Sequence, residues 1–521
     1  MDGQSETKKS KTGLIVGIVV GVLLIVGIGG YFIFQSMVNT PKNSYLLSEK
    51  ADIDNTFEIF EERFSEELEW YEYMQENPVQ TDLNITASSN DPSLQQMGLS
   101  ELISGSEINI STGTDMEDEI STFALSADVA GFSVDGLDLF LTGDNAGITF
   151  PFIEEYLTLN EADAPGLLSM MDPAFSEEEE IDYSVFFDDQ MLSETEREYI
   201  EDEYMSYIHD QLPDDAFESE NEEITVGENT INAEKLTMNL SEEQIHTFLS
   251  DLFNKMADDE ELINMIQAQV TASSIGMPQD EADQIGSNVS DSLRTAAEDV
   301  QNVGFPDGLS SVIWLDGDDI VQRDLNVTTV NNDTTATVNL NGTNEISENG
   351  NVMNYNAVLG DGTEEMTFTI NADLNEVENG FEDTITLSTS EADSNIVLTS
   401  TKDNSGDAVN STLQLDVPMG QGMENLSIFL ESESTYEDDQ VTADYTIYAE
   451  DGVSITRDTA TLNIAQESVT VDSVSVPDLT NEVNIGQMSE EELNDYFTNT
   501  FGPAFDSWVN ENFGGMEPGG F

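Results

Sequence analysis

The sequence contains no cysteine, only 13 Lys and Arg, and only 2 His among its 521 residues. The lack of cysteine excludes disulfides, thiolate metal sites, iron–sulfur clusters and cysteine nucleophiles. Against these few bases stand 107 Asp and Glu, which give a formal net charge of −94. Such a surface repels phosphate backbones, so we expect no nucleic-acid partner. Hydrophobic residues make up 38 % of the chain, which is enough to build a folded core.

Sequence motifs of known catalytic sites are also missing. The two histidines, His209 and His246, belong to no H-E-x-x-H sequence, and the segment Gly131–Gly136 misses the G-x-S-x-G spacing by one residue. No glycine-rich phosphate loop with a lysine is present. We therefore predict no enzyme, no catalytic residue, no cofactor and no metal. Two alternatives stay open: a hydrolase that uses paired carboxylates, and calcium held by acidic loops such as Asp316–Asp319.

The excess of acidic residues predicts that the protein works in a medium of high salt concentration. Acids are spread through amphipathic segments, and Glu177–Glu180 is the longest run of Glu, so the pattern indicates a folded acidic surface rather than a charged tail. Repulsion among these charges reaches about 8 Å at physiological ionic strength but only about 3 Å at 1 M salt. A calcium-rich or acidic surrounding would also neutralise the carboxylates.

Residues 13–34 contain no charge and no side-chain amide. At 1.5 Å per residue, such a helix can cross a hydrocarbon core about 30 Å thick. Lys8, Lys9 and Lys11 precede this segment, and positive residues favour the cytoplasmic side. We therefore expect a transmembrane signal anchor at 13–34, a cytoplasmic stub at 1–12 and an extracellular bulk. The alternative is a cleaved signal peptide.

Three glycines of this segment, Gly13, Gly17 and Gly21, stand four residues apart. On a helix they would share one face, where small residues let two membrane helices approach closely. The spacing suggests homodimerisation through the membrane helix, in addition to the lipid bilayer as a partner of residues 13–34.

Hydrophobic periodicity predicts the organisation that follows. The fold class we expect is α+β: an N-terminal transmembrane helix followed by large antiparallel β-meander sheets packed over amphipathic helices. The expected segments are a long amphipathic helix at 43–77, an antiparallel sheet at 78–160, a mainly helical region at 161–303 with a strand pair near 221–240, a β-meander at 304–480, a C-terminal helix at 489–512 and a flexible tail at 513–521.

This order of elements resembles membrane-anchored Firmicutes proteins of unknown function. The segments that carry the resemblance are Pro151–Leu157, the strand pair Gly227–Lys235 and the helix start Leu240–Gln244. The architecture is loosely similar to the half-barrels of periplasmic lipoprotein carriers, which hold acyl chains between a sheet and helices. Neither resemblance implies catalytic residues.

These observations favour a non-catalytic binding or structural module of the cell envelope with a salt-adapted surface, which contacts an envelope component. The first alternative is a carrier of lipid or another apolar ligand. Its pocket would lie between the meander and the helices and be lined by Phe248, Leu252, Phe253 and Trp314. An envelope hydrolase and a sensor or scaffold are further alternatives.

Overall fold

A computed structural model describes residues 40–129, 132–171, 181–187, 194–272, 279–331, 334–347, 349–360, 365–390, 395–419 and 425–513. The chain divides into two compact units. Unit 1 comprises residues 1–63, 192–266 and 285–398, and unit 2 comprises 64–191, 267–284 and 399–521. The meander predicted at 304–480 is therefore shared between the units, and strand β15 (Ile396–Asp403) contains the point of division.

The sheet of unit 1 is an antiparallel meander in which each strand pairs with the next along the chain. The alternation of apolar and polar residues forms these strands, because successive side chains point to opposite faces. A residue with positive φ closes the turn at Asp316-Gly317, where Gly317 has φ +70°. The strands are β7 (Phe217–Val226), β8 (Asn229–Leu240), β9 (Leu309–Asp316), β10 (Asp319–Asn331), β11 (Thr334–Ser347), β12 (Gly350–Gly360), β13 (Glu365–Val377) and β14 (Gly380–Thr389).

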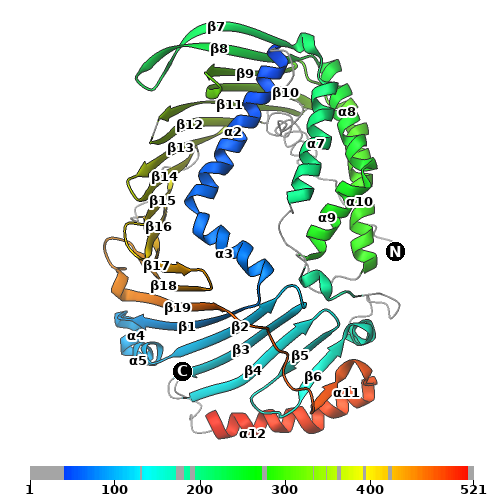
Figure 1. Ribbon diagram of the computed structural model, residues 1–521, viewed down its shortest axis with the longest axis vertical. Helices are drawn as coiled ribbons and strands as arrows, with labels where there is room; N and C mark the ends of the chain where they lie inside the picture. Colours follow the sequence, from blue (N-terminus) through cyan, green and yellow to red (C-terminus); the bar gives the residue numbers. More distant parts are fainter. Residues whose placement is uncertain are drawn as a thin grey trace. The chain divides into compact units, whose positions relative to one another are not determined.

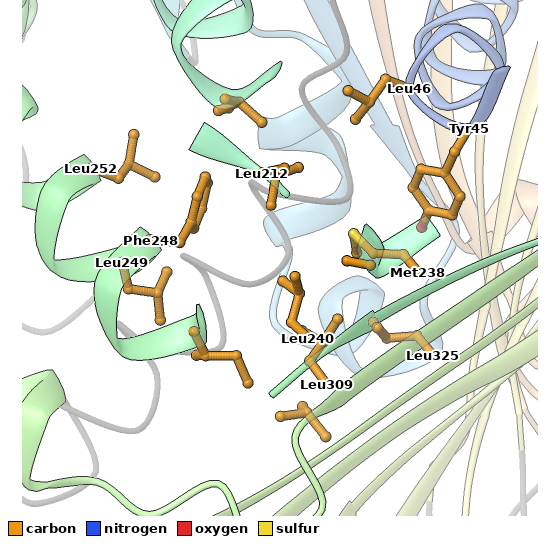
Figure 2. Packing of buried hydrophobic residues seen from close by; sticks show 14 of the residues in the cluster. Tyr45, Leu46, Leu212, Met238, Leu240, Phe248, Leu249, Leu252, Leu309 and Leu325 are labelled. Carbon is orange, nitrogen blue, oxygen red and sulfur yellow. The ribbon is translucent and has the colours of Figure 1, made fainter. Parts of the chain in front are cut away.

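Helices cover one face of strands β8 to β10 and form the main core with it. Figure 2 shows Phe248 and Leu249 of one helix near Leu212 and near the strand residues Leu240 and Leu309. A capping box formed by Ser241 and Gln244 starts that helix. The helices are α2 (Pro41–Arg63), α7 (Glu194–Gln211), α8 (Glu242–Asp258), α9 (Glu260–Ala272) and α10 (Gln279–Asp299).

Helix α2 runs across the strands of the same sheet (Figure 1). Near its beginning, Tyr45 donates a hydrogen bond to Ser311 on β9 at 2.7 Å. At its end, Arg63 donates from Nε to Asp383 on β14 at 2.9 Å. The helix is therefore fixed to the sheet at both ends. The amphipathic helix expected at 43–77 is divided after Arg63, and α3 begins at Ser65.

The sheet of unit 2 joins two segments that the sequence treats as separate. Strand β1 pairs with β2 on one side and with β19 on the other. The order is β16, β17, β18, β19, β1, β2, β3, β4, β5, β6 and β20, with β20 parallel to β6 and every other neighbouring pair of this order antiparallel. The strands are β1 (Val79–Ser89), β2 (Glu107–Asp115), β3 (Ile120–Val129), β4 (Phe132–Thr142), β5 (Asn145–Thr149), β6 (Tyr156–Asn160), β16 (Val409–Val417), β17 (Leu426–Glu437), β18 (Gln440–Glu450), β19 (Ala460–Thr470) and β20 (Glu482–Asn484).

The C-terminal helical segment packs against the loop that follows β5. Phe501 lies 5.3 Å from Phe150 and 4.9 Å from Phe152, measured between ring centroids. A capping box formed by Ser489 and Glu492 starts this helical segment. The helices of unit 2 are α3 (Ser65–Glu76), α4 (Pro92–Gln96), α5 (Leu99–Ser104), α6 (Ala164–Met171), α11 (Glu490–Tyr496) and α12 (Gly502–Phe513), with a π-helical turn at Phe497–Phe501.

The predicted fold class needs a correction at its first element. Among the residues that the structure describes, no helix is both long enough and apolar enough to cross a membrane. The first described helix, α2, has the lysines Lys42 and Lys50 and several acids, so it cannot take that role. The predicted anchor at 13–34, the stub at 1–12 and the tail from 514 onward lie outside the described residues. Over the described residues the fold consists of antiparallel sheets packed with helices.

Candidate functional site

An apolar groove of about 410 Å³ lies on one face of the sheet of unit 2. Four neighbouring strands, β3 to β6, and the segment after β20 form it. Its apolar lining side chains are Phe123, Leu139, Leu141, Ala146, Ile148, Leu157, Leu159 and Ile485. The volume falls within the range of about 300–1,000 Å³ that is typical of small-molecule sites.

The strand register explains why these side chains meet. Phe123 pairs with Leu139, Leu139 with Ile148, and Ile148 with Leu157, across four neighbouring strands. Directly paired residues point to the same face of a sheet. The alternating pattern of each strand therefore builds one continuous apolar row.

On the opposite face of the same strands, an aromatic side chain fills the space above a glycine. Phe140 is 3 % exposed and lies against Gly147, where an added Cβ would come within 2.2 Å of the Phe140 ring. Only glycine leaves room for the ring there. By contrast, Leu139 on the groove side is 36 % exposed, so the groove is open to a ligand.

A second groove, of about 530 Å³, lies in unit 2 and has a different character. Its lining includes the carboxylates of Asp82, Asp135, Asp138, Asp444 and Glu467. Burial raises the pKa of Asp138, and the charge of Asp135 adds to this effect. Among the described residues, no group of three or more acids or histidines is arranged to hold a metal ion.

Three of the four residues predicted to line a ligand pocket are packed inside unit 1. Phe248, Leu252 and Phe253 are 3 %, 2 % and 7 % exposed and belong to the main core. Trp314 lies in another cluster with Val226, Ala233 and Val321. Because Ile313 on the same strand belongs to the main core, the neighbouring Trp314 points to the other face of the sheet. The structure thus brings together three of the four.

The indole of Trp314 has a polar environment. Its Nε1–H donates to Glu222 Oε2 at 2.9 Å, and the ammonium of Lys235 lies 5.8 Å from the ring centroid. The Glu222 carboxyl has a lowered pKa, first because of this hydrogen bond and then because of the bond from Lys235. These contacts fix the ring within its sheet.

The two histidines are used in helix packing within unit 1. The Nε2 atom of His246 lies 2.7 Å from the carbonyl oxygen of Val303, and that of His209 lies 3.1 Å from Asn43 Oδ1. Gly13, Gly17 and Gly21, the residues predicted to pack membrane helices, lie outside the described residues.

The sequence predicts an antiparallel sheet at 78–160, which contains the strands that build the apolar groove, but it predicts neither strand β5 nor the groove. Alternation marks Phe123 and Leu139 as residues of one sheet face. The missing information is which strands pair and whether a helix covers them. A usable signal was the scarcity of amphipathic helices near residues 79–160, which leaves part of an apolar face without a cover.

No family model and no curated protein matches this sequence. Solved structures that are similar include a loop-deletion mutant of OmpT, an outer membrane protein of Vibrio cholerae, with 7 % identity, a TM-score of 0.19, and coverage of 75 % of this chain and 97 % of that chain. Acinetobacter baumannii OccAB3 has 6 % identity, a TM-score of 0.22, and coverage of 76 % and 98 %. Salmonella typhi OmpF in complex with daunomycin has 8 % identity, a TM-score of 0.14, and coverage of 77 % and 99 %.

These TM-scores are too low to support any statement about the function or location of this chain. The resemblance to Firmicutes proteins and the extracellular location stay predictions from the sequence.

Proposed function

We propose that this chain is a non-catalytic binding protein that holds an apolar ligand in the groove of unit 2. The observation that carries the proposal is the lining of that groove, a continuous row of apolar side chains across β3, β4, β5 and β6. The carrier alternative from the sequence is thus retained, with Leu139 and Ile148 in place of the residues first expected to bind the ligand.

The energy of binding would come from burial of apolar surface. Each methylene group removed from water contributes about 0.8 kcal/mol. An alkyl chain that buries about eight methylenes gains about 6 kcal/mol before the loss of its freedom is subtracted. Because association itself costs about 4 kcal/mol or more, a tightly held ligand would need a longer apolar part or an additional polar contact.

Exposed apolar side chains on the rest of this face support the same function. Ile108, Leu413 and Ile428 are 36 %, 39 % and 39 % exposed. The strand pairings place them on the same face of the sheet as the groove. In soluble proteins, another structural element or a partner normally covers such an apolar sheet face.

The test is binding of the neutral fluorescent probe diphenylhexatriene to the full chain in concentrated NaCl. Its fluorescence rises when it enters an apolar site. We expect saturable binding, and we expect the double variant Leu139→Gln with Ile148→Gln to weaken it by about tenfold or more, because each substitution removes about 1 kcal/mol or more of apolar contact.

The matched control is Val453→Gln, which makes a similar change at a side chain that is 72 % exposed in a loop of unit 2. This variant should bind the probe as the unchanged chain does. Circular dichroism of each variant shows whether it is folded. Equal affinity in the unchanged chain and a folded double variant would contradict the proposal.

A further inference from the structure

The groove of unit 2 is built from a stretch of chain that has no base. Between Phe64 and Met191 the sequence contains no Lys, Arg or His. All the strands that line the groove belong to this stretch, and Ile485 is the one lining residue from outside it. No positive side chain can therefore come from these strands to meet a ligand.

The basic side chains elsewhere in unit 2 already form ion pairs with acids outside the groove. They are Lys402 and Arg457, since residues 267–284 contain none. Lys402 donates to Glu66 and Glu67 at 2.7 and 3.0 Å. Arg457 lies 2.9 Å from Glu431 Oε2. An anionic head group in the groove would thus lack a counter-charge.

Acids stand instead at the ends of the groove. The carboxylate of Glu119 lies against Gly143, next to the strand ends that carry Ser121 and Leu141. Asp163 accepts hydrogen bonds from Asn484 and Gln487 at 3.0 Å each, on either side of the lining residue Ile485. The apolar floor is therefore bordered by negative charge at two places.

Building on the proposed function, we infer that the ligand of this groove is a cationic amphiphile, with one alkyl or aromatic apolar chain and an ammonium head group. The apolar part would occupy the row from Phe123 to Leu157. The ammonium would lie at the acidic border, near Glu119 or Asp163. Charge complementarity excludes fatty acids and other anionic amphiphiles, because like charges placed together in a binding site weaken it.

Three probes that share one apolar chromophore test this inference on the full chain. They are neutral diphenylhexatriene, its trimethylammonium derivative and its propionic acid derivative. In about 1 M NaCl we expect the cationic probe to bind about tenfold or more tightly than the anionic one, and more tightly than the neutral one. The ratio should fall at about 3 M NaCl, because the screening range of about 3 Å at 1 M shortens further.

The double variant Glu119→Gln with Asp163→Asn tests the border directly. Both substitutions keep the shape of the side chains. We expect them to weaken the cationic probe several-fold while the neutral probe binds as before. The matched control, Glu437→Gln, neutralises an acid at the far end of β17 and should leave all three affinities unchanged.

The outcomes separate this inference from the proposed function. If the three probes bind with equal affinity, or if the double variant leaves the ratio unchanged, the cationic assignment is wrong and the apolar groove still stands. If none of the probes binds, both are wrong.

Discussion

Arg323 illustrates how a chain with few bases uses them. Its guanidinium is buried and donates to both oxygens of Glu49, at 2.8 and 2.7 Å, and to Asp52 at 2.9 Å. Each basic side chain described between residues 42 and 457 likewise forms an ion pair. Burial raises the pKa of Glu49 above its usual value, and the charge of Arg323 opposes this effect only in part. The pair therefore stabilises α2 on the sheet only while both partners are present.

Removal of Arg323 should be costly. We expect Arg323→Met to lower the free energy of unfolding by about 3–5 kcal/mol, because the substitution leaves the buried carboxylate of Glu49 and the partly buried carboxylate of Asp52 without their partner. The control is Arg294→Met in the same unit, whose side chain is 48 % exposed and whose loss should cost about 0–1 kcal/mol. Denaturant unfolding at fixed salt measures both. Equal losses in the two variants would show that burial of the Arg323 pair has no energetic importance.

The beginning of helix α9 depends on one carboxylate. Asp259 accepts from the backbone N–H of Leu262 at 3.0 Å, from Tyr204 at 2.7 Å and from Tyr199 at 2.9 Å. Burial opposes ionisation of Asp259, but these hydrogen bonds outweigh it and hold its pKa below the usual value. Burial, and then the bond to Asp259, raise the pKa of Tyr199 to about 12. Helices α7 and α9 are thus joined by neutral tyrosines.

This arrangement predicts an alkaline dependence. A raised pKa in the folded state means that the contribution of Tyr199 is complete below about pH 10, its unfolded value, and is lost as the pH rises through about 12. We expect the unchanged chain to be more stable than Tyr199→Phe at about pH 9 and the difference to shrink toward about pH 12. Denaturant unfolding across this range measures it. A constant difference would contradict the assigned pKa.

Local sequence patterns predict helices and strands better than they predict which of these elements pack or pair with one another. The spacing of Phe57, Phe60, Phe64 and Leu68 suggests one uninterrupted helix, yet the helix breaks after Arg63. Arg63 is held by Asp383, 320 residues away, and no local pattern shows that tie. Similarly, alternation predicts β1 and β19, but their pairing joins residues more than 350 positions apart. The groove depends on such pairings. Phe248 and Trp314 are both apolar in the sequence, but the alternation of side chains along β9 places Trp314 on the face of the sheet opposite the main core.

At the scale of the whole molecule, the net charge of −94 sets the conditions for stability. Buried pairs such as Arg323 with Glu49 are screened little by salt, whereas the exposed carboxylates repel one another until salt screens them. We expect the melting temperature of the chain to rise as NaCl increases from about 0.1 to about 3 M. Scanning calorimetry measures this. A melting temperature that stays constant or falls would exclude salt adaptation.

If the proposed function is right, the purified protein contains a bound apolar ligand. A groove lined by Phe123, Leu139 and Ile148 should retain its ligand when the chain is purified from its own cells in concentrated salt. A ligand held by apolar contact is released by organic solvent, so its identity and amount can be determined together.

The most direct measurement is organic extraction of the purified chain followed by mass spectrometry of the extract, with the variant Leu139→Gln, Ile148→Gln prepared in parallel. We predict about one amphiphile per unchanged chain, with an apolar chain and a positively charged head group, and a strong depletion of it in the variant. Extracts that contain no such molecule, or the same amount from both proteins, would contradict the account.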